Sequence, residues 1–467
     1  MLPSIILLLV LFIIMLVLIG KGTIERAAIV LICALVAFFI IITLEKAPPD
    51  VVVGFLFGTV TNNFTNFHTL LLIFGMMVIS TICQQTGLFQ FIASKMIQVT
   101  RGDPKKLVIF IGLFTYGVSA ILEDSITAII LIPITIIVCK SLALKPAPYV
   151  IMQALFIKLG ATVLPISSVP SIMITTDQGI TFFEYLATAG LVSFSIAIFT
   201  ILIFLMLFRQ KSPKDHLLVS PSTTDLDTLH VPKDRKMMYV SLGTFIAIIF
   251  GFIFIPPAIL SSDAIAFTGA MFLVLCNIRK AEVIFKAIDF NFLLYLLGIF
   301  IITGCLDYVG VINLIAQGLT FLGITDLGFA FLALLWIGAV ASAFVDNIPI
   351  TQLFLPLINV LMGAKGTSTA KIGSMGLSLG VIWGDNFTPF GDSILALAVA
   401  KSNDVTIQPK DFFKYGFPIT LLQLGVISLV VLLLFDAIIG LIVCGIAGII
   451  LCVIFHYHIR KKSRQIE

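Results

Sequence analysis

Two adjacent pairs of carboxylate and amide side chains lie midway along apolar stretches of the chain. Glu123 is followed by Asp124, and Asp346 is followed by Asn347. Because apolar residues flank both pairs, we expect them deep in a membrane, where one charged side chain costs about 3 kcal/mol. A helix N-cap accounts for Asp124 or for Asn347 alone, but not for a second carboxylate beside it. The pairs therefore predict a site for cations or protons, in which Glu123 and Asp124 share a proton.

Two further apolar segments, 148–175 and 371–400, are interrupted by glycine, proline and polar residues. A break at that depth is tolerated only where protein or water covers the freed backbone groups. A proline kink patched by hydroxyl groups suffices for Ser167 and Ser168 but does not explain Asp385. The residues expected to break the two helices are Gly160, Thr162, Pro165, Ser167, Ser168, Gly384, Pro389 and Gly391. The residues expected to bind the ion are Glu123, Asp124, Ser125, Thr127, Asp346, Asn347, Asp385, Asn386, Thr388, Asp392 and Ser393.

Lys158 is the single lysine expected among the carboxylates of this site. With Lys158, the group carries a charge of −4 when all five acidic residues are ionised, namely Glu123, Asp124, Asp346, Asp385 and Asp392. Such a charge cannot persist in a low dielectric without bound cations or protons. The site therefore favours Na⁺ or H⁺ over an unescorted anion, and no arginine falls inside a predicted span core. We expect Lys158 as a permanent counter-ion or as a group that exchanges its proton. The alternative is a lysine that snorkels to the membrane surface.

The overall composition requires a membrane protein. Of the 467 residues, 60% are hydrophobic and 11% are charged, and the mean hydropathy is +1.17. Soluble domains carry about 25% charged residues, so a soluble enzyme, a nucleic-acid-binding module, a disordered chain and a disulfide scaffold are excluded. The seven cysteines form no C-x-x-C pair and are expected as buried free thiols. The sequence predicts no cofactor and no metal beyond a transported cation.

Nine apolar segments are long enough to cross a membrane, which takes about 20 residues. They are 3–19, 27–44, 67–83, 183–208, 238–256, 258–276, 290–306, 417–434 and 436–456. The segments 107–138 and 327–362 carry the acidic pairs at their centres and are predicted to be re-entrant hairpins. Short amphipathic stretches near 51–60, 88–99 and 309–322 are expected at the membrane surface.

Positive charge sets the predicted orientation. With two hairpins and one crossing for each broken helix, 24 of the 28 Lys and Arg residues fall on one side of the membrane. The opposite loops hold only Lys46, Lys365 and Lys371. By the positive-inside rule the basic side is cytoplasmic. We therefore expect a protein of the plasma (inner) membrane with its N-terminus outside and its C-terminus in the cytoplasm.

The two halves of the chain are related by an internal repeat. A shift of 223 residues aligns 67–133 with the second half without gaps, placing Gly75 on Gly298 and Ser119 on Ser342; after one insertion the shift is 224. The predicted topology runs the two copies in opposite directions. Inverted repeats with interrupted helices are typical of secondary transporters. The sequence thus predicts an all-α polytopic membrane protein of two inverted-topology repeats with re-entrant hairpins and broken helices. The expected domains are a first repeat with N-terminal helices (1–208), a cytoplasmic linker (209–236), a second, inverted repeat (237–435) and an extra helix with a basic tail (436–467).

Motifs between residues 20 and 435 resemble the ion transporter superfamily. The stretches 74–77, 86–89 and 101–106 are similar to the third span of that superfamily and its following loop. The run 342–349 matches the S-A-x-x-D-N-x-P motif, and 159–172 resembles the N-I-G-G-T-A-T-x-I-G-D-P-P-N segment. The chain therefore resembles the branch of arsenite permeases, NhaD-type sodium–proton antiporters and the P protein, with its citrate transporter-like domain. This resemblance implies homodimers and an elevator-like movement.

The chain departs from these motifs at the site itself. The first D-N pair of the family reads Glu123-Asp124 here, and Lys158 replaces a motif asparagine. The added carboxylates favour cation–proton exchange, with Na⁺ as the leading cation and with Lys158 and the acidic pair carrying the protons. The expected partners are Na⁺, H⁺, membrane lipid and a second copy of the chain, and no nucleic acid.

Other activities stay open from the sequence. Within transport they are export of arsenite or another small oxyanion, and cation-coupled carboxylate transport. A passive channel predicts conductance without counter-transport. An intramembrane aspartyl protease would use Asp346 and Asp385, but the chain has no G-x-G-D motif. The preferred prediction is a transporter and not an enzyme.

Overall fold

The computed structural model of this chain is built of helices. It describes residues 2–21, 24–59, 64–86, 104–142, 144–207, 235–256, 259–321, 327–363, 366–389 and 393–435. All regular secondary structure in these residues is helical, which confirms the predicted fold class. The predicted segments 88–99 and 436–456 lie outside the described residues, as does the linker up to residue 234.

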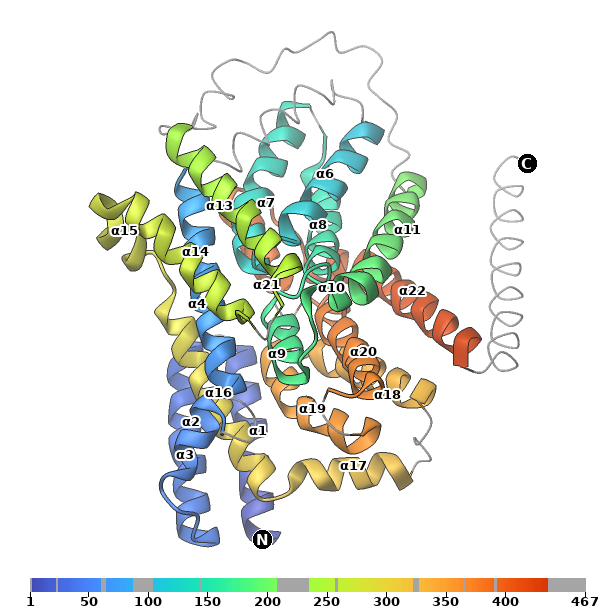
Figure 1. Ribbon diagram of the computed structural model, residues 1–467. Helices are drawn as coiled ribbons and strands as arrows, with labels where there is room; N and C mark the ends of the chain where they lie inside the picture. Colours follow the sequence, from blue (N-terminus) through green and yellow to red (C-terminus); the bar gives the residue numbers. More distant parts are fainter. Residues whose placement is uncertain are drawn as a thin grey trace, which may run out of the picture.

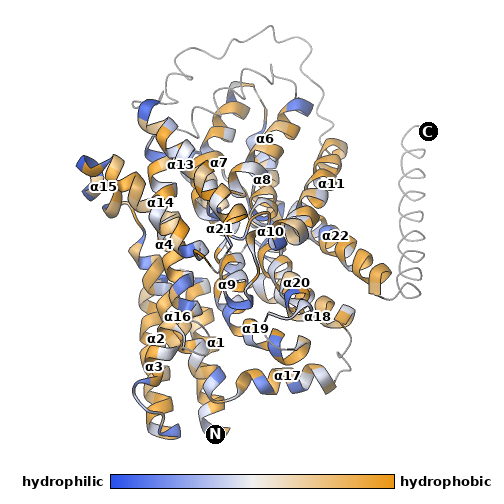
Figure 2. Cartoon of the chain, in the orientation of Figure 1, coloured by the Kyte–Doolittle hydropathy of each residue, from blue (hydrophilic) through white to orange (hydrophobic). Residues whose placement is uncertain are grey.

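Several long helices are apolar over most of their length. They are α1 (Leu2–Lys21), α2 (Arg26–Glu45), α4 (Thr65–Gln85), α11 (Leu191–Leu207), α13 (Arg235–Phe254), α14 (Ser262–Cys276), α16 (Phe290–Tyr308) and α22 (Pro409–Phe435). α11 continues a short α10 (Phe182–Tyr185) and a π-helical turn, Leu186–Gly190. Within the described residues, seven helices are long and apolar enough to cross a membrane. There are eight if α14 and the segment Ile278–Lys286, which follows it after a bend of 92° and includes α15 (Ala281–Lys286), count as one span. Hydrophobic residues dominate these helices (Figure 2).

Two helical hairpins reach the middle of the molecule from opposite ends (Figure 1). Hairpin one joins α6 (Pro104–Ser119) to α7 (Asp124–Ser141), and hairpin two joins α18 (Leu327–Ser342) to α19 (Asn347–Met362). The short helices α3 (Val51–Phe57) and α17 (Val311–Phe321) lie at the same end of the molecule as the N-terminus. The opposite entry of the hairpins is the arrangement that inverted repeats require.

Each hairpin tip is closed by an acidic N-cap. The Oε2 atom of Glu123 accepts a hydrogen bond from a backbone N–H of α7 at 3.3 Å, and the Oδ1 atom of Asp346 accepts one from α19 at 3.0 Å. The alternative in which Asp124 and Asn347 are the N-caps is therefore wrong, because the caps lie one residue earlier. These two are instead the first residues of the returning helices, where their side chains make other contacts.

Two broken helices accompany the hairpins. The first runs through α8 (Pro146–Gly160) and α9 (Val169–Gln178), and the second through α20 (Ser368–Gly384) and α21 (Ser393–Ser402). α8 packs against hairpin one and α20 against hairpin two. We call the hairpins and the broken helices together the core.

Glycines let each broken helix touch its hairpin closely. A Cβ atom on Gly160 would lie 2.5 Å from the carbonyl oxygen of Tyr116, and one on Gly384 would lie 2.3 Å from that of Ala339. Real Cβ atoms essentially never approach backbone under 3.0 Å. Tyr116 and Ala339 are repeat partners at the shift of 223, so the two halves make the same contact.

The helices α2, α4, α14 and α16, which we call the scaffold, pair across the two halves. α4 packs on α14, and α16 packs on α2. A Cβ on Gly75 would lie 3.0 Å from the backbone of Ala266, and one on Gly298 would lie 2.6 Å from Val30. Val30 and Ala266 are 236 positions apart, which relates α2 to α14 as repeat partners. Each half thus supplies one helix to each pair, and the repeats are interlocked.

The glycine contacts predict the effect of one added methyl group. Gly160→Ala and Gly384→Ala should each destabilise the protein by about 1–3 kcal/mol, because backbone carbonyls cannot move away as flexible side chains can. The measurement is the apparent melting temperature of the purified protein in detergent. Gly243→Ala is the matched control, since no atom lies within 4 Å of its Cβ position. A Gly384→Ala protein that melts with this control would contradict the prediction.

Candidate ion-binding site

Lys158 lies at the centre of a buried ionised group. Its Nζ atom is 2.8 Å from Oδ2 of Asp124 and 2.9 Å from Oδ2 of Asp385. The three residues come from α8, from the start of α7 and from the end of α20. Their side chains are 4%, 9% and 0% exposed, so Lys158 does not snorkel to a surface. An ammonium this deep is stable only with such partners.

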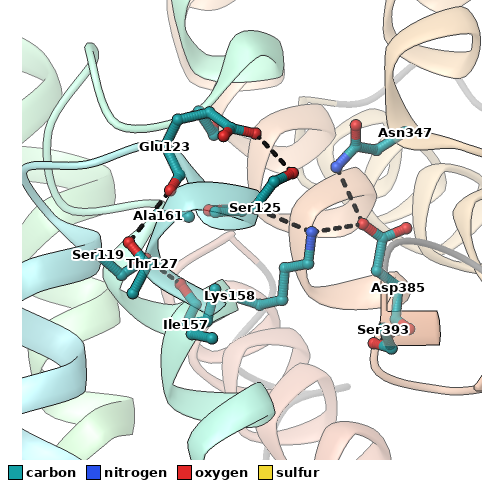
Figure 3. Close-up of polar contacts among 12 residues, drawn as sticks. Ser119, Glu123, Ser125, Thr127, Ile157, Lys158, Ala161, Asn347, Asp385 and Ser393 are labelled. Carbon is teal, nitrogen blue, oxygen red and sulfur yellow. Dashed lines mark hydrogen bonds and ion pairs between the residues drawn. The ribbon is translucent and has the colours of Figure 1, made fainter. Parts of the chain in front are cut away.

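Hairpin two holds the Asp385 carboxylate in place. The Nδ2 atom of Asn347 donates to its Oδ2 at 2.9 Å, and the hydroxyl of Ser342 contacts its Oδ1. Figure 3 shows Asp385 between the Lys158 ammonium and the Asn347 amide. One tip residue of each hairpin, Asp124 and Asn347, therefore meets the same ion-paired group.

A second set of repeat-related bonds ties each hairpin to its broken helix. The Ser119 hydroxyl donates to the carbonyl of Ile157 at 2.6 Å, and the Ser342 hydroxyl lies 2.6 Å from the carbonyl of Val381. The first of these carbonyls directly precedes Lys158. The serine pair therefore fixes the helices at the level of the ion pairs.

The two capping carboxylates have further polar partners. Glu123 Oε1 accepts a hydrogen bond from the Ser125 hydroxyl at 3.0 Å. Asp346 Oδ2 forms an ion pair at 3.2 Å with Arg26, the first residue of α2. Arg26 stands at the end of a scaffold helix, so this ion pair joins the scaffold to the tip of hairpin two.

A cavity of about 330 Å³, the site cavity, opens between the scaffold and both hairpin tips. Its charged lining residues are Glu25, Arg26, Glu123, Asp124, Asp289 and Asp346. Five carboxylates against one guanidinium make the cavity electronegative and raise the local concentration of cations. A second cavity of about 270 Å³ shares Glu123, Ser125 and Ser168 with it. We call it the inner cavity, after the side that the positive-inside rule predicts to be cytoplasmic.

The residues expected to break the first helix have structural contacts. The Thr162 hydroxyl donates to the Leu159 carbonyl at 2.8 Å. The Ser167 hydroxyl can donate to either of two freed backbone carbonyls, those of Ala161 and Leu164, and Ser168 caps α9. Hydroxyls patching an interrupted helix therefore explain Thr162 and Ser167. Ser168 also lines both cavities next to the site. Pro165 stands in the same non-helical break.

The residues predicted at the second break differ in what their side chains contact. The Thr388 hydroxyl bonds the Ala343 carbonyl in hairpin two, and the Ser393 hydroxyl donates to the Asp385 carbonyl at 2.9 Å. Asn386 is fully buried, and its Nδ2 atom has no hydrogen-bond partner among the described residues. Pro389 ends the described part of this break. Gly391 and Asp392 lie outside the described residues.

The Thr127 hydroxyl forms a hydrogen bond within its own hairpin and not with the ion-paired residues. Its hydroxyl donates to the backbone carbonyl of Glu123 at 3.1 Å, as threonines in helices commonly do. The structure therefore brings Glu123, Asp124, Asp346 and Asn347 together with Lys158 and Asp385, whereas Thr127 serves the helix.

A chain of hydroxyl groups supports the broken helices behind the site. Ser168 and Ser171 are 2.8 Å apart, Ser171 and Tyr185 are 2.7 Å apart, and Tyr185 and Ser378 are 2.8 Å apart. The chain links the start of α9, the end of α10 and the middle of α20. It holds the two broken helices together across the repeat boundary.

Sequence reasoning missed two contributors to the site. Arg26 lies one residue before the predicted span 27–44 and was therefore counted as a loop charge. Ser342 belongs to the S-A-x-x-D-N-x-P motif, in which the sequence predicts the acidic pair and not the serine as ion ligands. The repeat offered a signal for Ser342, because it falls on Ser119. No pattern in the sequence indicated the contact of Arg26 with Asp346, which joins residues 320 positions apart.

Inverted hairpins and broken helices around a buried ionised group define a membrane transporter. A family model described as "Citrate transporter" (CitMHS) matches residues 9–380, and the chain belongs to this family. An uncharacterized transporter of Mycobacterium bovis is 25% identical over 373 residues, which cover 78% of this chain and 85% of that protein. The P protein of Sus scrofa is 24% identical over 432 residues, covering 76% of this chain and 51% of the P protein.

A solved structure supports the same fold. The YdaH transporter of Alcanivorax borkumensis, described as having an unusual topology, superposes with a TM-score of 0.57. The match covers 87% of this chain and 95% of that one, at 13% sequence identity. At this identity the likeness establishes the fold and not the transported solute.

The buried ion pairs predict how Lys158 substitutions change stability. Lys158→Met leaves two carboxylates without their cation and should cost about 3–5 kcal/mol. The double variant Lys158→Met/Asp385→Asn should recover part of that loss, because one of the two like charges is gone. The measurement is the apparent melting temperature in detergent at pH 8.

The exposed ion pair of Lys286 with Glu282, at 2.7 Å, provides the control. Lys286→Met should cost no more than about 1 kcal/mol, because water screens that pair. If Lys158→Met melted with Lys286→Met, or if the double variant were the least stable of the three, the buried ion pairs would not have the assigned role.

Proposed function

We propose that this chain exchanges a monovalent cation, Na⁺ first among them, for H⁺. The observation that carries the proposal is the Lys158 ammonium bound between the carboxylates of Asp124 and Asp385. Two buried carboxylates facing each other across a single positive charge form a cation site that is occupied by a side chain. Na⁺ prefers the same oxygen ligands and carries the same charge.

The exchange follows from charge balance at this site. Na⁺ can take the two carboxylates only if Lys158 leaves them, and a buried ammonium without a counter-ion loses its proton. One bound Na⁺ thus replaces one H⁺, Lys158 becomes a neutral amine, and the net charge of the site does not change. Release of Na⁺ on the other side requires Lys158 to take a proton again. Antiport with a fixed ratio results from this competition.

The charges around the site cavity support a cation over a free anion. The N-termini of α7 and α19 point their partial positive charge toward the tips, where they would stabilise an anion. Glu123 and Asp346 already occupy these two positions as caps. An anionic substrate would therefore meet two fixed carboxylates where other anion sites offer backbone N–H groups.

Cation-coupled carboxylate transport is the second candidate. Citrate appears in the description of the family, and Arg26, Asn291 and Asn347 line the site cavity of about 330 Å³. A carboxylate substrate would need the Arg26 guanidinium and a bound cation to offset the acidic lining. In this case the Lys158 site would serve the coupling ion.

Transport in liposomes tests the exchange. Purified protein is reconstituted with an internal pH dye under an imposed pH gradient, and Na⁺, K⁺, Li⁺, Mg²⁺ or arsenite is added in turn. We expect Na⁺ to collapse the gradient in the parent protein. Lys158→Arg should reduce this exchange at least tenfold, because a guanidinium keeps its charge in proteins and cannot release a proton.

Two controls separate the possible causes of a lost signal. Asp346→Asn/Asp385→Asn removes two of the predicted ligands and should be silent. Lys158→Arg should melt at a higher temperature than Lys158→Met, which shows that its site stays paired. If no cation changed the dye signal and labelled citrate was taken up, the exchange proposal would be contradicted and the carboxylate carrier supported.

A further inference from the structure

The ion pair of Arg26 with Asp346 joins two parts of the molecule that are otherwise distinct. Arg26 begins the scaffold helix α2, and Asp346 caps the helix at the tip of hairpin two in the core. Their closest atoms are 3.2 Å apart, and the Asp346 side chain is 7% exposed. A charge pair across this boundary stabilises one position of the core relative to the scaffold.

Two repeat-related cavities show that the core is displaced along the scaffold. The inner cavity includes Met77, Ser80 and Gln84 of α4. A cavity of about 270 Å³ at the other end of the molecule, the outer cavity, includes their repeat partners on α16, which are Phe300, Thr303 and Asp307. These three scaffold positions therefore line a cavity in both halves.

The core sides of these cavities do not correspond. Hairpin one lines the inner cavity from its tip, with Glu123 to Ile129. Hairpin two lines the outer cavity farther from its tip, with Gln352 to Asn359. The repeat partners of 123–129 are 346–352, so the two hairpins differ by about seven residues. At 1.5 Å per helical residue this is a displacement of about 10 Å toward the inner cavity.

In the opposite arrangement, each repeat would adopt the conformation that the other repeat has now, and the core would be displaced toward the outer cavity. Glu123 would then occupy the place that Asp346 has now, and the repeat partner of Arg26 would stand opposite it. The shift of 236 positions that relates α2 to α14 places Ser262 there, at the first position of α14. Ser262 is neutral, and it is followed by Asp263, which pairs with His68 at 2.9 Å. The two end positions therefore differ in their charge.

We propose that Arg26 is a positioning residue that holds the core in the present arrangement through its ion pair with Asp346. The proposal rests on the proposed function, in which the core carries its ion from one side of the membrane to the other. The tip of hairpin two pairs with Arg26 in this arrangement, whereas the corresponding scaffold position for hairpin one holds the neutral Ser262. The ion pair therefore favours the present arrangement over its opposite.

Distances between spin labels test this role without measuring transport. One label is placed on Val283 of α15, next to the scaffold, and the other on Ser402 at the end of α21 in the core; both residues are exposed. The protein is studied in nanodiscs at pH 8 without Na⁺, with its native cysteines replaced by serine. The parent should show one distance population. Arg26→Gln should add a second population that the parent lacks.

Two variants control for charge and structure. Arg26→Lys keeps the positive charge and should restore the single population. Arg279→Gln removes an exposed arginine elsewhere on the scaffold side and should match the parent. If Arg26→Gln gave the same distances as the parent, the proposal would be overturned.

Exchange in liposomes distinguishes this proposal from the proposed function. Collapse of the pH gradient by Na⁺ tests the cation assignment without reference to the distances. If Arg26→Gln shifts the distances but Na⁺ does not collapse the gradient in the parent, the role of Arg26 stands and Na⁺ is not the transported cation. If Na⁺ collapses the gradient and Arg26→Gln does not shift the distances, the cation assignment stands and the role of Arg26 is contradicted.

Discussion

The bond network of the Lys158 ammonium with Asp124 and Asp385 is the interaction on which the rest of the structure depends. Removing three charges from water costs several kcal/mol for each, and their mutual contacts at 2.8 and 2.9 Å, together with the hydrogen bonds from hairpin two to Asp385, offset that cost. The three residues come from three different helices. Hairpin one, α8 and α20 must therefore meet at one point, and the glycines at 160 and 384 make the approach possible.

The inverted repeat determines how the helices are arranged, and the residues that differ between the two halves determine the charges of the site. The acidic residues Glu123 and Asp346 are repeat partners, and each caps the returning helix of its hairpin. The ionised residues of the centre have neutral partners: Asp124 matches Asn347, and Lys158 matches Ile382 at the shift of 224. A symmetric site would place two lysines or two more carboxylates in one buried volume. One charged member in each pair limits the charge of this group to −1, with either the Lys158 ammonium or a bound Na⁺ between the two carboxylates.

Much of the fold could be predicted from the sequence, because its signals are local or repeated. The hairpins follow from acidic pairs in the middle of apolar runs, and their confirmed positions are 104–141 and 327–362. Which carboxylates meet Lys158 could not be predicted, since that depends on the packing of helices far apart in the chain. The caps are an example, because the side chain of Glu123 caps the helix whereas that of the next residue, Asp124, reaches Lys158. Arg26 was missed for the same reason, because its role comes from a contact between halves.

Proton release by the purified protein tests the central claim most directly. Na⁺ is added to protein in unbuffered detergent solution with a pH indicator, and binding is followed in parallel by calorimetry. If Na⁺ displaces the Lys158 ammonium, about one proton per chain should appear as Na⁺ binds, and Lys158→Arg should release none. Sodium binding without proton release, or the same release from Lys158→Arg, would contradict the account.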